Sequence, residues 1–331
     1  MLKILEFGKK VRPFIDKFMF ELLRGKPSEL YDAASHLPKA GGKRLRPVLL
    51  LAVTKGVGEN WKKAIPAAAA IELLHNFTLV HDDIMDKDEF RRGVPTVHKI
   101  WGEDIAILAG DLLFSKVFEA ASKLLDYGVE PDKVVQVVNR LSQAATIVAE
   151  GQTLDLRFVK EVYVSEREYL DMIERKTATL FKIAAEIGAI IGNASSECIE
   201  KIKEYGLNIG IAFQIRDDIL GLTADEKKLG KPVYSDLREG KKTILVINAL
   251  SKLPEHEKQF LLKVLGKTQD INLLKKAAEL IIRSGALDYA EELAKQYVKK
   301  ALISLEQSCI QDKEVYEMLK ELALYIVERE R

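Results

Sequence analysis

Apolar residues recur every three to four positions along almost the whole chain, which is the period of an amphipathic α-helix. The sequence has no Asn-Gly turn between alternating segments, so it carries no β-hairpin signal of that kind. Breaks are expected at Gly41-Gly42, 56–58, 93–95, Gly192-Asn193 and Gly285. We therefore predict an all-α protein with helices over 3–24, 29–36, 47–55, 61–85, 97–101, 104–126, 131–151, 166–191, 197–222, 242–251, 255–265, 271–284, 286–308 and 312–329.

Helix starts and the domain count follow from local signals. Ser165 with Glu168, and Thr223 with Glu226, have capping-box spacing, which predicts helix starts just after 165 and 223. No Pro/Ser-rich or low-complexity linker divides the chain, so we expect one domain over 1–331, although length alone allows two. Segments 64–80 and 104–120 are apolar on more than one face, which is typical of helices inside a bundle or at a subunit interface.

Charge and composition exclude several classes of protein. The chain has 51 Lys and Arg against 50 Asp and Glu, a net charge of +1, so we expect no nucleic-acid partner and no anionic membrane surface. The most apolar run, 64–80, is interrupted by Glu72 and His75, and charged residues break any signal peptide, so we predict a cytoplasmic protein without stable membrane insertion. With only two cysteines, Cys198 and Cys309, we expect neither a disulfide framework nor a zinc site.

Two acidic motifs lie in apolar helical stretches. Asp82, Asp83 and Asp86 form the first, and Asp217 with Asp218 the second. Carboxylates among apolar neighbours either hold a proton or gather cations, because burying an unpaired charge is costly. Asp82 and Asp86 are four residues apart, hence on one helix face, which suits Mg²⁺ shared with phosphate oxygens. The alternatives are a solvated acidic helix end and a calcium loop, but the spacing of a calcium loop is missing.

Cationic side chains lie near these motifs and at loops. Gly41-Gly42 precede Lys43, Arg44 and Arg46, and a guanidinium can hold phosphate oxygens through two hydrogen bonds. Each of the other candidates would more often be a surface or structural group if taken alone; they are His75, Arg91, Arg92, Lys176, Thr177, Gln214, Lys231 and Lys241. No Ser-His-Asp or Cys-His arrangement indicates covalent catalysis. The set as a whole predicts a diphosphate site.

These motifs, from Gly41 to Thr243, resemble those of the trans-isoprenyl diphosphate synthases, or polyprenyl synthetases, and most of all the archaeal short-chain enzymes that make geranylgeranyl diphosphate. The resemblance implies an all-α bundle around a deep central cavity, in a homodimer or higher homo-oligomer, with both acidic motifs at the mouth of the cavity. It also implies about three Mg²⁺ ions per active site when substrate is bound.

The resemblance further implies a role for each residue. Metal ligands would be Asp82, Asp86 and Asp217, and the catalytic set would add Asp83, Asp218, Lys176 and Lys231. Isopentenyl diphosphate would bind to Lys43, Arg46, His75 and Arg92. The allylic diphosphate would bind to Arg91, Lys176, Thr177, Gln214, Lys231 and Lys241. The second motif departs from many relatives, since it ends in Gly221 where they have a third aspartate.

The implied reaction is a prenyl transfer in which the allylic diphosphate ionises and isopentenyl diphosphate attacks the carbocation. Phe77 lies five residues before Asp82, about 7.5 Å along a helix, and with Thr78 and Leu74 it would set the chain length near twenty carbons. Farnesyl or longer products of twenty-five to thirty carbons are the alternative, and Phe77 is otherwise an ordinary core residue. A terpene cyclase needs no second diphosphate site, and a non-catalytic subunit needs no intact motifs. A module that only binds Mg²⁺ and phosphate would be excluded by turnover of an allylic substrate.

Overall fold

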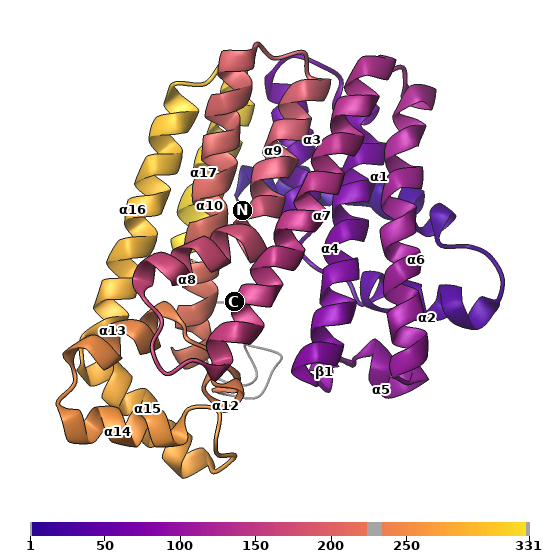
Figure 1. Ribbon diagram of the computed structural model, residues 1–331. Coiled ribbons are helices and arrows are strands. Elements are labelled where there is room, and N and C mark those ends of the chain that lie inside the picture. The colour runs from indigo at the N-terminus through magenta and orange to yellow at the C-terminus, as the bar shows by residue number, and fades with distance from the viewer. Residues whose placement is uncertain (1, 224–233, 329–331) are drawn as a thin grey trace. The chain divides into compact units, whose positions relative to one another are not determined.

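The computed structural model describes residues 2–223 and 234–328, and these are mostly helical (Figure 1). The α-helices are α1 (Lys3–Leu22), α2 (Ser28–Lys39), α3 (Leu45–Gly56), α4 (Ile65–Asp86), α5 (Val97–Trp101), α6 (Glu103–Ser122), α7 (Pro131–Lys160), α8 (Glu166–Ile173), α9 (Thr179–Ile191), α10 (Ser196–Thr223), α12 (Ser235–Glu239), α13 (Ile244–Lys252), α14 (Glu255–Val264), α15 (Ile271–Arg283), α16 (Ala286–Glu306) and α17 (Lys313–Glu328). Two 3₁₀-helices, η1 (Trp61–Ala64) and η2 (Lys123–Tyr127), and a π-helix, η3 (Glu174–Ala178), join some of them. The all-α prediction is confirmed.

Most predicted helices are present, with shifted ends. The helix over 97–101 has the predicted bounds, whereas α7 continues to Lys160, past the predicted end at 151. The segment predicted as one helix over 166–191 is divided into α8, the π-helix and α9. Ser165 caps α8 in the predicted capping box with Glu168. Thr223 ends α10, and the helix start predicted after it lies outside the described residues.

A short β-hairpin is present, although the sequence carries no Asn-Gly signal for one. Strand β1 (Phe90–Arg91) pairs antiparallel with β2 (Val94–Pro95). The two residues of its turn, Arg92 and Gly93, have φ of 54° and 76°, and a type I′ turn needs two positive φ values. The hairpin was missed because Arg-Gly stands where Asn-Gly usually gives the signal. Helix α12 was also missed, since no predicted helix covers 235–239.

Contacts divide the described residues into two compact units, each described by itself. The first unit comprises those within Met1–Ala145, Leu180–Gly206 and Leu302–Leu322. The second comprises those within Thr146–Thr179, Leu207–Ala301 and Ala323–Arg331. That the whole chain acts as a single domain around a central cavity stays a prediction.

Helix α4 lies at the centre of the first unit, where it packs against α1, α3 and α6 (Figure 1). Its first three turns are apolar on all faces and are buried from Ile65 to Leu74, including the charged Glu72. Close packing elsewhere in this unit depends on Gly188 in α9, because a Cβ there would lie 2.5 Å from the carbonyl oxygen of Leu50. Thr54 bridges the same two helices, donating to the carbonyls of Leu50 and Gly188.

The second unit has a core of its own. Apolar side chains of α10, α13, α14, α15 and α16 form it, and Ile215, Ile219, Leu245 and Leu274 are among the most buried. Full burial of one such aliphatic side chain contributes about 1.5–3 kcal/mol. The second acidic motif is placed directly beside this core, since Ile215 and Ile219 flank Asp217 and Asp218 on α10.

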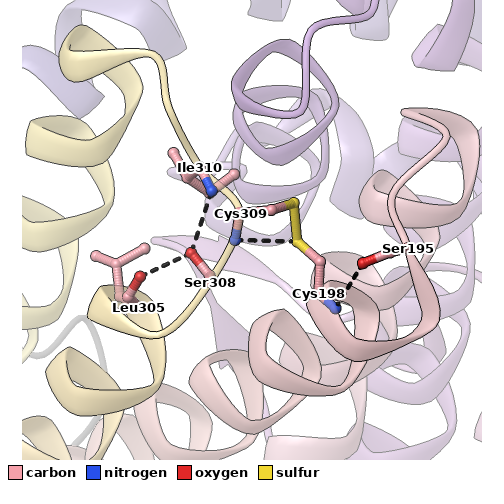
Figure 2. The surroundings of a disulfide bond; sticks show 6 residues. All are labelled: Ser195, Cys198, Leu305, Ser308, Cys309 and Ile310. Carbon is pink, nitrogen blue, oxygen red and sulfur yellow. Dashed lines mark hydrogen bonds between the residues drawn. A yellow bond between two sulfur atoms is a disulfide. The ribbon is translucent and has the colours of Figure 1, made fainter.

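Cys198 and Cys309 form a disulfide, so the expectation that excluded one was wrong (Figure 2). Cys198 lies in the first turn of α10, where Ser195 accepts a hydrogen bond from its backbone nitrogen. Cys309 lies between α16 and α17, 111 residues later. Only the tertiary fold of the first unit brings them together, which is why sequence spacing gave no sign of the bond. Within the described ranges, no helix is both long and apolar enough to cross a membrane.

Candidate active site

The first acidic motif ends helix α4. Lys87, with φ of 57°, caps the helix after Asp86, and its backbone nitrogen donates to the carbonyl of Ile84. Asp82 and Asp86 are partly exposed one turn apart, whereas Asp83 is buried, 1% exposed. The predicted face of two accessible carboxylates is therefore present, and the third carboxylate points into the protein.

The β-hairpin returns Arg91 to the end of α4. Its guanidinium forms an ion pair with Asp83 and donates to Asp88 Oδ2 at 3.0 Å. Burial disfavours the charged guanidinium, but Asp83, Asp88 and Asp82 outweigh that effect and hold the pKa of Arg91 above its usual value. Asp83 thus fixes a permanent positive charge beside the accessible carboxylates.

The glycine loop presents Lys43, and the first turn of α3, which follows it, presents Arg46. Gly41 and Gly42 have φ of 94° and 135°, values that a residue with a side chain rarely adopts. Arg12 Nη2 donates to the backbone carbonyl of Lys43 at 3.0 Å, which fixes the backbone of the loop. Arg46 stacks on the ring of Phe181, with Cζ 4.4 Å from the ring centroid.

Arg46 also contacts His75 on α4, since its Nη1 lies 3.3 Å from His75 Nε2. A guanidinium can only donate, so Nε2 accepts and carries no proton. Desolvation, followed by the charges of Arg46, Arg92, Arg91 and Arg44, holds the pKa of His75 well below its usual value. His75 is therefore neutral at pH 7 and can donate from Nδ1, among residues that are otherwise cationic.

The second unit holds the other predicted residues around the π-helix. Lys176 Nζ donates to Asp155 Oδ2 at 2.6 Å, and Thr177 Oγ1 donates to Gln214 Oε1 at 2.7 Å. A Cβ at Gly151 would lie 2.4 Å from the backbone nitrogen of Lys176, so α7 can approach the widened turn only because residue 151 is glycine.

In the second acidic motif, as in the first, one aspartate is accessible and its neighbour is buried. Asp217 is partly exposed, and Asp218 is 6% exposed and held from both sides. Tyr169 donates to Asp218 Oδ2 at 2.7 Å, and Gln214 Nε2 donates to Oδ1 at 2.8 Å. Burial, then the charge of Asp236, raises the pKa of Asp218 to about 8. Asp217 is the accessible ligand candidate, and Asp218 lies behind it.

Gly221, which stands where many relatives have a third aspartate, affects the packing of α10. A Cβ at this position would lie 2.6 Å from Asp236 Oδ2, so glycine allows the Asp236 carboxylate to approach α10. Lys241 follows α12 and forms an ion pair with Glu239 at 2.6 Å. Lys231, predicted for both catalysis and allylic binding, lies outside the described residues.

The three predicted chain-length residues lie on α4. Leu74 is buried, and Thr78 donates its hydroxyl to the carbonyl of His75. Phe77 packs against Phe114 of α6, with ring centroids 5.0 Å apart, and Phe114 in turn contacts Phe118 at 5.2 Å. An aromatic wall therefore lies on the α6 side of α4, below the first motif.

The donor set fits a hard divalent cation. Across residues 2–223 and 234–328, no three His, Cys, Asp or Glu side chains form a complete metal-binding group. Asp82 and Asp86 in the first unit, and Asp217 in the second, offer carboxylate oxygens only, and Mg²⁺ commonly takes one or two carboxylates and completes its shell with phosphate and water. Within each unit, these carboxylates are of the kind that fits Mg²⁺ bound together with a diphosphate.

Several residues of the site were not predicted. Asp155 and Tyr169 hold Lys176 and Asp218, and Asp236 acts on Asp218 from another helix. The sequence offered a sign only for Glu72, a buried carboxylate in an otherwise apolar run, which forms an ion pair with Arg44 at 2.7 Å. The others could not be found without tertiary contacts.

The chain is similar to known proteins in sequence and in structure. A family model described as polyprenyl synthetase matches residues 27–281. The chain belongs to the polyprenyl synthetase family. It is 48% identical over 306 residues to a geranylgeranyl diphosphate synthase of Saccharolobus solfataricus, covering 91% of each chain.

Two further proteins are similar to this polyprenyl synthetase over nearly its whole length. It is 45% identical over 317 residues to a geranylfarnesyl diphosphate synthase of Aeropyrum pernix, covering 95% of this chain and 99% of the relative. The crystal structure of a geranylgeranyl pyrophosphate synthetase from Pyrococcus horikoshii matches with a TM-score of 0.92 and 46% identity, covering 98% of both chains. The all-α fold is thus shared with solved enzymes of the family.

Proposed function

We propose that this polyprenyl synthetase is a short-chain trans-prenyltransferase that condenses isopentenyl diphosphate with dimethylallyl, geranyl and farnesyl diphosphate to give geranylgeranyl diphosphate and free diphosphate. The observation that carries the proposal is the pairing of Arg46 with a neutral His75, near Arg92. This cationic group is distinct from the aspartates and gives a second place for a diphosphate. The names of relatives at 48% and 46% identity support the same assignment.

The two substrates would be held by different groups. Isopentenyl diphosphate would bind to Lys43, Arg46, His75 and Arg92 of the first unit. The allylic diphosphate would bind to Arg91 and the basic side chains that follow in sequence, Lys176, Lys231 and Lys241, with Thr177 and Gln214 as neutral partners. Arg91 is already held charged by Asp83, so it needs no proton rearrangement when substrate arrives.

Reaction begins with loss of the allylic diphosphate. Mg²⁺ held by Asp82, Asp86 and Asp217 would neutralise charge on the leaving group and so favour cleavage of its C–O bond. Lys176 and Arg91 would hold the departing oxygens in place as their charge grows. The double bond of isopentenyl diphosphate then forms the new C–C bond to the allylic carbocation, and loss of a proton to the departing diphosphate restores a double bond.

We propose twenty carbons as the main product length, because Phe77, supported by Phe114, would close the space below the first motif. The geranylfarnesyl name of the Aeropyrum relative supports a longer product as the second candidate. Leu74 and Thr78, on the same helix, would then decide between the two.

Three further features belong to the proposal. The two acidic motifs would face each other across one cavity in a single domain, with about three Mg²⁺ ions when substrate is bound. The chain would work in the cytoplasm.

A second copy would cover α6, where Ile107 and Leu108 are 45% and 51% exposed, near Ile100 at 47%. A monomer by light scattering would refute the dimer and leave the chemistry in place.

The test is incubation of purified protein with labelled isopentenyl diphosphate and each allylic primer in turn, with and without Mg²⁺. We expect Mg²⁺-dependent formation of a twenty-carbon diphosphate. Asp82→Ala should abolish turnover without altering the circular dichroism spectrum. No condensation with any primer would refute the proposal, and substantial activity of Asp82→Ala would refute the metal assignment.

A further inference from the structure

Arg44 lies between Lys43 and Arg46 in the sequence but points away from both, into the first unit. It is 4% exposed and adopts a φ of 52° at the N-terminal cap of α3, in the left-handed region that non-glycine residues seldom occupy. This backbone conformation turns one of three neighbouring cations inward. Arg44 is therefore not available to a diphosphate, whereas its two neighbours are partly exposed.

The Arg44 guanidinium donates hydrogen bonds to four oxygen acceptors. It donates to Glu72 Oε1 on α4 at 2.7 Å and to Asp16 Oδ1 on α1 at 3.1 Å. It also donates to the carbonyl of Pro38, in the last turn of α2, at 2.7 Å, and to that of Gly41, at the start of the glycine loop, at 3.3 Å. Arg44 thus ties the glycine loop and the start of α3, which carry Lys43 and Arg46, to helix α4.

Asn76 continues the same network along α4, one turn after Glu72. Its Nδ2 donates to Glu72 Oε1 at 3.0 Å and to the backbone carbonyl of Glu72 at 2.7 Å. Its Oδ1 accepts from Arg92 Nη1 at 3.3 Å, and the same nitrogen of Arg92 donates to the carbonyl of Leu37 at 3.0 Å. A Cβ at Gly42 would lie 3.2 Å from Arg92 Cζ, so the glycine loop and Arg92 meet directly.

We infer that Arg44, Glu72 and Asn76 are positioning residues that set Lys43, Arg46 and Arg92 in register as one receptor for isopentenyl diphosphate. The inference rests on the proposed function and adds residues that touch no substrate. Glu72 and Asn76 are 2% and 0% exposed, so they act through the arginines alone. Their buried hydrogen bonds hold cations that would otherwise repel one another near the neutral His75.

The network joins residues of the proposed isopentenyl diphosphate site. Its hydrogen bonds connect α1, α2, α4, the N-terminal cap of α3 and Arg92 of the hairpin, all in the first unit, whereas Lys176 and Gln214 belong to the second unit. Loss of the network should therefore weaken the binding of isopentenyl diphosphate and leave the binding of the allylic diphosphate nearly unchanged. Loss of a residue needed only for general stability would weaken the binding of both substrates alike.

The test compares Arg44→Lys, Glu72→Gln and Asn76→Ala with the wild type. We expect the KM for isopentenyl diphosphate to rise about tenfold, equivalent to about 1.4 kcal/mol, while the KM for farnesyl diphosphate and kcat change less than about twofold. Calorimetry with isopentenyl diphosphate alone, in which no turnover occurs, should give the same loss in affinity.

Arg140→Lys is the matched control, because Arg140 also pairs with a buried glutamate, Glu186, at 2.6 Å in the first unit but lies outside the network. It should change neither KM. If the folded variants change the KM for both substrates equally, or change neither KM, the inference is overturned. Turnover by the wild type would still support the proposed function in that case. Should Glu72→Gln fail to fold, Arg44→Lys and Asn76→Ala still decide the matter. A wild type that neither binds nor condenses isopentenyl diphosphate would instead refute the proposed function.

Discussion

The disulfide between Cys198 and Cys309 should contribute a large share of the stability of the first unit. A cross-link restricts the unfolded chain, and the loss of entropy grows with the logarithm of the enclosed loop. For a separation of 111 residues this relation gives about 5 kcal/mol at 25 °C. Whole domains are stable by only about 5–15 kcal/mol, so removal of the bond should be easily measured.

The perturbation is Cys309→Ser, with Cys198→Ala as an independent second variant. Little native packing should be lost with Cys309→Ser, because Cys309 is only partly buried and its backbone nitrogen, which donates to Cys198 Sγ at 3.2 Å, is unchanged by the substitution. Cys198 is 3% exposed, so Cys198→Ala adds a small packing loss of its own. Agreement between the two variants would separate the cross-link from local packing.

The assay is urea unfolding without reductant, followed by circular dichroism. Each variant should unfold at lower urea than the wild type, with a larger m-value, because an unfolded chain without the cross-link exposes more surface. Reductant should lower the wild-type midpoint to that of the variants and leave the variants unchanged. Two free thiols in the untreated, unfolded wild type, or equal midpoints with and without reductant, would refute the reasoning.

Other predictions concern the product, the histidine and the packing. Phe77→Ala should lengthen the product beyond twenty carbons, and an unchanged product distribution by chromatography would place the floor elsewhere. Because the pKa of His75 is depressed in the folded state, only the unfolded chain binds this proton as pH falls below about 6.5. Stability should therefore fall by up to about 1.4 kcal/mol per pH unit, and His75→Asn should remove that part of the slope in urea titrations. Gly210→Ala should cost about 1–3 kcal/mol, since its Cβ would meet the Cα of Ala178 at 2.6 Å; an unchanged melting temperature would contradict this.

Helical periodicity and motif chemistry were sufficient for much of the fold and for the family. The apolar stripes predicted nearly every long helix, because burial of one face is the main force that forms them. The ends were less certain, as in α7, where Gly151 was taken as an end although it is a point of close contact with the π-helix. Helix continuity there depends on tertiary packing, which local propensity does not contain.

Most of the side chains that contact the functional residues could not be predicted from the sequence. The chemistry of the aspartate doublets was predicted, but nothing in their spacing distinguishes the partly exposed Asp82 and Asp217 from the buried Asp83 and Asp218. That division depends on Arg91 arriving from a hairpin and on Tyr169 arriving from α8. Likewise, Cys198 and Cys309 meet only through the fold of the helices between them.

The π-helix from Glu174 to Ala178 makes the site sensitive to insertions and deletions. A π-turn accommodates one residue more than the α-helix around it, so loss of a single residue there can restore a regular helix. Such a deletion would leave the flanking turns in register but displace residues within the widened turn, which would turn Lys176 or Thr177 away from its partner. The helix would survive the change and the active site would not, so chains of this kind should tolerate substitution around Lys176 more readily than any change in length.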